Sequence, residues 1–150
     1  MNLEDLTEIA EQSAQAEKTH RHCVRVCMAA SCQSSGAGEV IEGFKSQAEK
    51  NDDQDVRIKP VGCMGLCSAG PLVSVDATEL DEGLLYRDVN AEDTEELYSS
   101  LDGQPVERLR CSTDIPFFAR QQRIVLKNSG VIDPEQIDDY IAAGGYASLV

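Results

Sequence analysis

The chain has 150 residues, of which 41% are hydrophobic, and 27 acidic against 13 basic side chains give it a formal net charge of -14. This length suits one ordinary domain with an appendage, and no apolar run approaches the roughly 18 residues of a membrane span. The excess of acid argues against nucleic-acid binding, which depends on Lys and Arg contacts to phosphate. The acidic N-terminus lacks the features of a secretory signal, so we expect a cytoplasmic protein without a membrane span.

The first part of the chain predicts a helix, a strand and a second helix. Apolar residues at helical spacing between Leu3 and Ala14 indicate an amphipathic helix, followed by a polar linker that ends at residue 20. Residues 22–27 alternate apolar and polar side chains, as a strand with one buried face does. Residues 28–38 are small and polar and predict a loop, and residues 39–50 predict the second helix.

The middle of the chain predicts the rest of a sheet. Residues 56–61 suggest a second strand, which runs into a tight glycine-containing loop. Residues 71–75 and 84–89, separated by an acidic turn around residues 79–83, predict a β-hairpin. Asn90 is a suitable cap for a helix that extends to Leu101. This order predicts an α/β layer with cysteines at strand ends, and it is compatible with a thioredoxin-like sheet.

The last part of the chain predicts a basic connecting segment and a short helix. Asp133, Pro134 and Gln136 are suited to be the cap, the first turn and the capping-box partner of this helix. Gly144 and its neighbour Gly145 predict where the helix ends.

Six cysteines in a chain expected in a reducing compartment indicate metal binding or catalysis rather than a disulfide scaffold. Cys27 and Cys32 are five positions apart on one predicted loop, and Cys63 and Cys67 are four apart on another. A 2Fe-2S cluster takes four thiolates, two on each iron, so two short loops from neighbouring strands can supply one pair to each metal. The sequence therefore predicts these four cysteines as cluster ligands.

Small residues around the cysteines have predicted roles in the same site. Gly62 and Gly65 are expected to bring the backbone close to the cofactor, so that N–H groups point at its sulfurs and tune the reduction potential. Ser31, Ser34 and Ser35 are further candidate donors on the other loop.

Two other kinds of site stay open on spacing alone. A structural zinc held by four cysteines would use the same loops, although zinc sites favour Cys-x2-Cys pairs, which this chain lacks. A thioredoxin-type disulfide catalyst needs the same missing pair. Cys23 and Cys111 have no partner at ligand spacing and are expected to be small buried side chains. His20 and His22 are expected to be surface or core residues and not ligands.

The segments that carry the four cysteines are similar to those of a known family. Residues 26–32 (VCMAASC) and 61–71 (VGCMGLCSAGP) resemble the thioredoxin-like 2Fe-2S ferredoxin domain, and all four ligands of that family are present at matching spacing. The resemblance implies an α/β, thioredoxin-like 2Fe-2S ferredoxin fold with a C-terminal helical extension. It also implies electron transfer, one electron per step, through a 2Fe-2S cluster.

Residues 116–146 resemble a different protein, the start of the NADH- and FMN-binding flavoprotein subunit of complex I and its relatives. A ferredoxin-like domain followed by such a flavoprotein is similar to the diaphorase flavoprotein subunit of bidirectional NAD-linked nickel-iron hydrogenases. Related subunits serve NAD-dependent formate dehydrogenases and electron-bifurcating hydrogenases. We therefore expect an N-terminal helix and linker at residues 1–20, a thioredoxin-like 2Fe-2S domain at residues 21–108, and a connector with the start of a flavoprotein domain at residues 109–150.

The resemblance implies further cofactors and partners beyond these residues. No glycine-rich phosphate-binding loop is present in the sequence, so FMN and a 4Fe-4S cluster are expected only in a downstream flavoprotein domain that is missing here. The chain alone is therefore not expected to oxidise NADH. The implied partners are other diaphorase and hydrogenase subunits, including a separate thioredoxin-like 2Fe-2S subunit. Ser129 stands where many relatives have cysteine, and it is expected not to touch the cluster.

Overall fold

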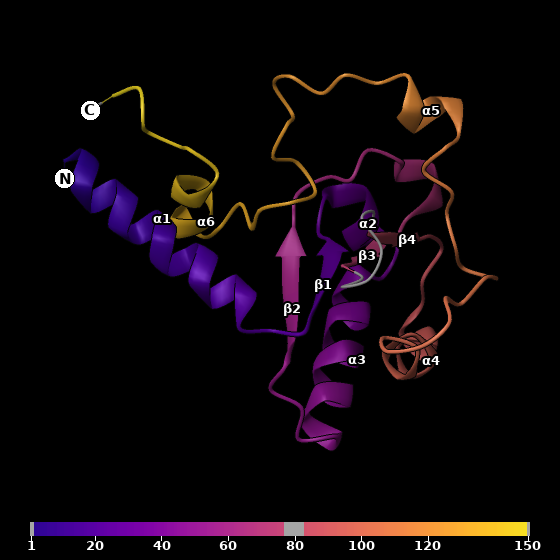
Figure 1. The fold of residues 1–150 in the computed structure, drawn as a ribbon. Helices are drawn as coiled ribbons and strands as arrows, with labels where there is room; N and C mark the ends of the chain where they lie inside the picture. The colour runs from indigo at the N-terminus through magenta and orange to yellow at the C-terminus, as the bar shows by residue number, and fades with distance from the viewer. Residues whose placement is uncertain (1, 77–82, 150) are drawn as a thin grey trace.

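The computed structural model describes residues 2–76 and 83–149, and it places a four-stranded mixed sheet at its centre (Figure 1). The strands are β1 (His22–Cys27), β2 (Val56–Val61), β3 (Val73–Val75) and β4 (Leu84–Tyr86), in the spatial order β2-β1-β3-β4. β1 and β2 are parallel, whereas β1 pairs with β3, and β3 with β4, in antiparallel fashion. The predicted turn between β3 and β4 lies largely outside the described residues.

Short and long helices connect and flank the strands. They are α1 (Leu3–Lys18), α2 (Ala30–Ser34), α3 (Ala37–Lys50), α4 (Thr94–Ser99), α5 (Pro116–Ala119) and α6 (Ile137–Ala142), with single turns η1 (Cys67–Ala69) and η2 (Ala91–Asp93). α3 is the crossover between the parallel strands β1 and β2. Within the described ranges, no helix is long and apolar enough to cross a membrane.

The core lies where the sheet meets α3 and α4. Val40 and Phe44 share one face of α3 because they are four positions apart, and both are fully buried. They meet Val24 and Val26, which are the alternate buried positions of β1, and Leu97 of α4. The alternate residues of β1 and the residues on one face of α3 thus pack into one apolar cluster.

The predicted loop at residues 28–38 differs from the structure, because it contains the short helix α2. Residues 28–35 include no glycine or proline, and the Gln33 backbone N–H donates to the Ala29 carbonyl at 2.9 Å. The Gln33 side-chain amide also donates to the Met28 carbonyl at 2.7 Å. These local bonds close a helical turn that places Cys32 in a buried position.

The last helix starts later than the sequence predicts, at Ile137 with Gln136 as its cap. The Asp133 carboxylate accepts a hydrogen bond from the Glu135 backbone N–H at 2.9 Å. This bond closes a turn over residues 133–135. The Asp133 N–H donates instead to the Asp139 carboxylate at 2.8 Å. The prediction of a helix capped by Asp133 is wrong because the aspartate binds the amide of this preceding turn.

α1 and α6 lie side by side next to the edge strand β2, near the two chain ends (Figure 1). Lys59 of β2 is buried, and its Nζ lies 2.6 Å from Glu17 Oε1 and 2.5 Å from Asp139 Oδ2. We call Lys59, Glu17 and Asp139 the edge ion triad. It connects one helix from each end of the chain to the sheet.

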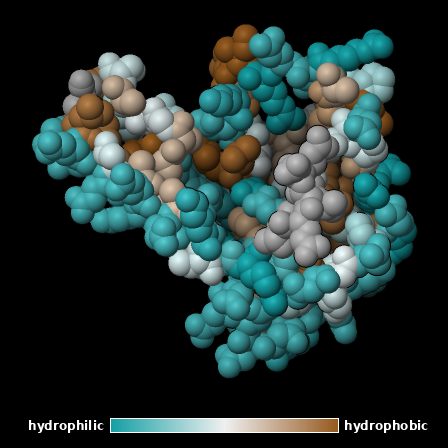
Figure 2. Space-filling model, viewed as in Figure 1, coloured by the Kyte–Doolittle hydropathy of each residue, from teal (hydrophilic) through white to brown (hydrophobic). Residues whose placement is uncertain are grey.

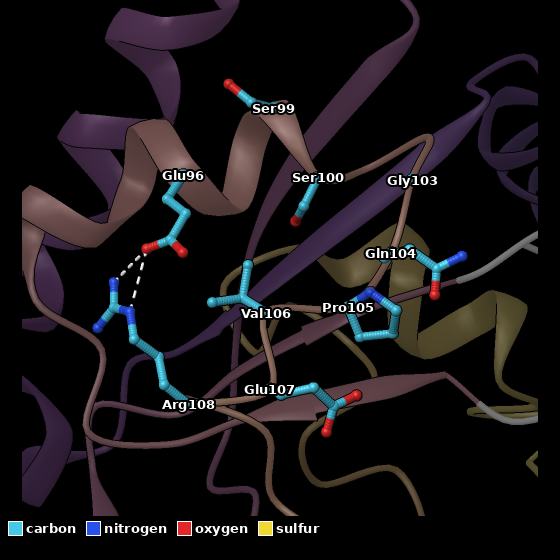
Figure 3. Close-up of a pocket in the computed structure, with 9 residues that line it drawn as sticks. All are labelled: Glu96, Ser99, Ser100, Gly103, Gln104, Pro105, Val106, Glu107 and Arg108. Carbon is cyan, nitrogen blue, oxygen red and sulfur yellow. Dashed lines mark hydrogen bonds and ion pairs between the residues drawn. The ribbon is translucent and has the colours of Figure 1, made fainter.

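The chain after α4 folds back under that helix. Figure 3 shows the shallow pocket formed there, with the Arg108 guanidinium turned toward the Glu96 carboxylate of α4. The same guanidinium donates to the Asp93 carboxylate at 2.7 Å. At the start of β1, His22 Nε2 lies 2.8 Å from Asp102 Oδ1. The apolar core extends past these polar contacts to Leu109 and Cys111, which are both buried in it.

Candidate metal centre

The parallel pairing of β1 and β2 brings the two predicted cysteine loops to one edge of the sheet. Cys27, the last residue of β1, lies opposite Val61, the last residue of β2. The Cys27 N–H donates to the Leu72 carbonyl at 3.0 Å, which fixes this end of β1 against the start of the hairpin. Because the carboxyl ends of parallel strands lie at the same edge, both cysteine loops leave the sheet side by side.

The four predicted ligands form two pairs of thiols. The Sγ atoms of Cys63 and Cys67 are 3.7 Å apart, close to the roughly 3.8 Å between two tetrahedral ligands with metal–sulfur bonds of about 2.3 Å. Cys27 and Cys32 interact directly through their thiols. In the part of the chain that the structure describes, no group of three or more His, Cys, Asp or Glu side chains is placed so that it could hold a metal ion. Two pairs of thiols fit a cluster in which each iron takes two.

The surroundings of Cys32 and Cys67 disfavour free thiolates at these two cysteines. Burial and then the neighbouring Cys27 thiol raise the pKa of Cys32 to about 11. The Cys63 thiol raises the pKa of Cys67, which is exposed at the surface. A bound metal cation reverses this preference, because a coordinating thiol loses its proton. Metal binding would therefore change the protonation of Cys32 and Cys67, whose thiols otherwise favour the neutral form.

The two predicted glycines contact the chain beyond residue 120. Gly65 has φ +103°, and a Cβ added there would lie 2.8 Å from Arg123 Nη2. Gly65 thus adopts a backbone conformation that other residues rarely take, and it leaves room for a side chain from elsewhere. At Gly62 an added Cβ would meet Ser129 Oγ at an ordinary 3.6 Å. That these glycines bind the cofactor stays a prediction.

A third glycine, Gly70, was not among the predicted site residues. A Cβ added to it would lie 2.7 Å from Cys32 Sγ, so only glycine lets the second loop approach the first so closely. The sequence signal that could have indicated Gly70 is its position between Cys67 and Pro71.

The predicted serine donors contribute unequally. The Ser31 hydroxyl donates across the site to the Cys67 carbonyl at 3.4 Å. The hydroxyls of Ser34 and Ser35 donate to carbonyls of their own helical turn, those of Ala30 and Ser31. Only Ser31 therefore connects the two cysteine loops among these three.

The remaining cysteines and histidines have other neighbours. Cys111 is buried, and burial raises its pKa. Cys23 is half-buried on β1, and burial raises its pKa as well. His22 pairs with Asp102, and His20 lies against the hydroxyl of the preceding threonine.

A segment that the sequence did not connect with the site closes over the second cysteine loop. It is residues 112–136, which include α5 and which we call the connector. Arg123 Nη2 donates to the Met64 carbonyl at 2.7 Å, and Ser129 Oγ donates to the Cys63 carbonyl at 2.7 Å. Ser129 therefore contacts the backbone of a predicted ligand, closer to the site than the sequence suggested.

These features define an α/β protein with a thioredoxin-like sheet and a four-thiol centre at the carboxyl edge of its parallel strands. The model of the thioredoxin-like [2Fe-2S] ferredoxin family matches residues 12–102, and the chain belongs to this family. It is 35% identical over 82 residues to a 2Fe-2S ferredoxin of Clostridium pasteurianum, which covers 53% of this chain and 76% of that protein. It is 36% identical over 90 residues to a 2Fe-2S ferredoxin of Aquifex aeolicus strain VF5, which covers 57% and 78%.

Solved structures show the same relationship. The crystal structure of the wild-type thioredoxin-like [2Fe-2S] ferredoxin from Aquifex aeolicus matches with a TM-score of 0.54 and 30% identity, covering 62% of this chain and 98% of that one. The predicted fold class and the predicted 2Fe-2S cofactor are thus confirmed. The domain boundaries and the four individual ligands stay predictions.

Proposed function

We propose that this chain transfers single electrons through a 2Fe-2S cluster held by Cys27, Cys32, Cys63 and Cys67, within the diaphorase flavoprotein subunit of an NAD-linked hydrogenase. The observation that carries the proposal is the meeting of two thiol pairs at one sheet edge in a member of the [2Fe-2S] ferredoxin family. When bound, the cluster supplies a one-electron acceptor and donor.

The two thiol pairs differ in exposure, and this difference suggests how a redox partner approaches. Cys27 and Cys32 are each 1% exposed, and they lie in the apolar core. Cys63 is half-buried and Cys67 is exposed. We propose that electrons enter and leave on the side of Cys63 and Cys67, where a partner comes nearest to the sulfurs.

Apolar surface outside the family match supports a place in a larger protein. Among the described residues, every large apolar side chain that is substantially exposed lies outside residues 12–102. Ile124, Val125 and Leu126 of the connector are 77%, 95% and 64% exposed. Figure 2 shows apolar surface at the top of the molecule, where the connector runs in Figure 1. Such exposed patches mark interaction surfaces, and we propose that an NADH- and FMN-binding domain covers this one.

The same module would also serve an NAD-dependent formate dehydrogenase or a complex I-like NADH dehydrogenase. The ferredoxin core and the connector do not distinguish the terminal acceptor, so these parent complexes remain alternatives within the proposal. In each of them the expected partners are further subunits that carry flavin and iron–sulfur cofactors.

The test compares the 150-residue chain with the same chain joined to a flavoprotein domain of this kind. NADH delivers a hydride, a pair of electrons, whereas one 2Fe-2S cluster takes a single electron, so a flavin must separate the pair. Dithionite should reduce the cluster in both proteins. NADH with added FMN should reduce it only in the longer protein, as followed by stopped-flow absorbance.

The outcomes separate the parts of the proposal. Rapid bleaching by NADH in the 150-residue chain would reveal a nucleotide site that the proposal lacks. No bleaching in the longer protein would contradict the diaphorase context while leaving electron transfer from dithionite in place. Zinc, without iron and sulfide, in the purified chain would contradict electron transfer itself.

A further inference from the structure

The connector contacts the second cysteine loop from outside the family match, which spans residues 12–102. Arg123 lies across residues 63–65, with Nη2 donating to the Met64 carbonyl at 2.7 Å and Nη1 to the Ser129 carbonyl at 3.3 Å. Ser129 in turn donates its hydroxyl to the Cys63 carbonyl at 2.7 Å. The carbonyls of Cys63, a predicted ligand, and of Met64 are therefore bound by side chains of the connector. These side chains lie more than twenty residues beyond residue 102, where the family match ends.

The loop is shaped to accept this guanidinium. Arg123 Nη2 occupies the space that a Cβ at Gly65 would enter, at 2.8 Å, and Gly65 has a φ of +103°. The guanidinium is a planar donor that binds two acceptors in fixed directions, so it restrains both the loop and the connector. Loss of the guanidinium would leave the Met64 carbonyl, which lies between the predicted ligands Cys63 and Cys67, without this hydrogen bond.

Arg123 brings a positive charge to the backbone of the second cysteine loop. Within the described ranges Arg123 makes no ion pair with a carboxylate, and its hydrogen-bond partners there are carbonyl oxygens. It is half-buried, so solvent and salt screen its field less than that of a surface arginine. Reduction adds one negative charge to a site of four thiolates, and a fixed positive charge beside the ligand loop favours that state.

We infer that Arg123 is a positioning residue that orders the loop of Cys63 and Cys67 and raises the reduction potential of the cluster. The inference rests on the proposed assignment of these two cysteines as ligands. Its two parts are separable, since the hydrogen bonds act on the geometry of the loop and the charge acts on the potential.

Three variants separate these parts. Arg123→Gln removes the charge, and Arg123→Lys keeps the charge but loses the forked geometry. The matched control is Arg120→Gln, which makes the same charge change on an exposed arginine that has no side-chain bond or ion pair among the described residues. Each protein is checked for iron and sulfide, titrated with dithionite while the visible spectrum is recorded, and measured as the apo chain by hydrogen exchange of residues 62–67.

Arg123→Gln should lower the reduced-to-oxidised ratio at a fixed potential about tenfold, which corresponds to about 59 mV for a one-electron couple. Arg123→Lys should change this ratio less than threefold, and Arg120→Gln should leave it unchanged. Both Arg123 variants should speed hydrogen exchange in the loop of the apo chain, because both lose the forked contact.

A parent chain without iron and sulfide would overturn the proposed function and the inference together. With the cluster present, a potential in Arg123→Gln equal to that of the Arg120→Gln control overturns the inference alone. If Arg123→Gln does not retain its cluster, the apo chain decides: faster loop exchange supports the positioning role, and unchanged exchange overturns it.

Discussion

The ferredoxin core and the layer formed by α1 and α6 are held by different forces. In the core, Val24, Phe44 and Leu97 are each at most 1% exposed, so apolar burial on both sides of one interface stabilises it. In the layer, Leu6 and Ile141 are the buried apolar side chains of the described parts of α1 and α6. The attachment there depends on the edge ion triad instead.

This difference indicates which part of the molecule can detach while the core stays folded. Apolar burial is non-directional and adds up over many residues, whereas a buried ion pair stabilises little beyond the cost of removing its charges from water. The core should therefore unfold as one unit, and the layer of α1 and α6 should detach at lower free energy. The strands that carry the metal centre belong to the core. The connector, which covers the second cysteine loop, belongs neither to the core nor to the layer of α1 and α6.

The most severe change should be removal of one ligand from the core edge. Cys63→Ser leaves three thiolates and a poorer oxygen ligand, so the protein should lose the cluster or hold it in a greatly weakened form. Iron and sulfide per chain, with the paramagnetic resonance of the dithionite-reduced protein, give the measurement. Cys111→Ser, at a buried cysteine away from the two loops, should retain the cluster. Full cluster content in Cys63→Ser would show that the ligand assignment is wrong.

Next in size is a cavity in the core. Phe44→Ala removes a ring that is fully buried between α3 and the sheet, and it should lower the free energy of unfolding by about 3–5 kcal/mol. Urea unfolding followed by circular dichroism measures the loss. Ala48→Gly, at a partly buried position of the same helix, should cost only about 1 kcal/mol. Equal losses in the two variants would contradict the placement of the core at Phe44.

A smaller and more local effect should follow from breaking the edge ion triad. Asp139→Asn leaves the buried Lys59 ammonium with Glu17 as its close carboxylate partner, at a cost of about 1–3 kcal/mol. Hydrogen exchange should become faster in α1 and α6 and stay unchanged in α3. Glu42→Gln, which breaks an exposed pair with Lys45, is the control and should change little. Equally faster exchange in α3 would mean that the layer and the core open together.

Local patterns were enough to predict the core. The alternation in residues 22–27 and the spacing of Val40 and Phe44 report burial directly, because each pattern matches the geometry of its own element. The four cysteines were visible for the same reason, since each pair lies on one short loop. The start of α6 was not, because an aspartate followed by proline is compatible both with a helix cap and with the turn that Asp133 closes.

Contacts between distant segments could not be predicted. Arg123 reaches Met64 across 59 positions, and Ser129 reaches Cys63 across 66, and no spacing rule connects such residues. Lys59 has the pattern of an exposed strand position, yet helices from both chain ends bury it. The contacts of the connector with the site, and those that attach α1 and α6 to the sheet, depend on the tertiary structure. The core and the set of predicted ligands can be recognised from short stretches of sequence.

The smallest expected effect tests the polar closure of the core at η2 and α4. The Asp93 carboxylate accepts hydrogen bonds from the Asn90 backbone N–H at 2.8 Å and from Arg108 at 2.7 Å. Burial by itself would raise the pKa of Asp93, but the Asn90 and Arg108 hydrogen bonds outweigh it and lower the pKa below the ordinary 3.8. Asp93 is therefore a place where acid should weaken the core through one identified group.

The sign of the effect follows from proton linkage. A carboxyl group whose pKa is lower in the folded chain stabilises the fold above its unfolded pKa, and this contribution disappears as the pH falls through the folded pKa. Asp93→Asn should thus be less stable than the parent near neutral pH, and the difference should shrink as the pH falls below the ordinary value of 3.8. Urea unfolding of both proteins over this range measures it, with Asp88→Asn as an exposed control beside Arg87. A difference that stays constant down to about pH 2 would show that Asp93 acts through its shape and hydrogen bonds, and not through its charge.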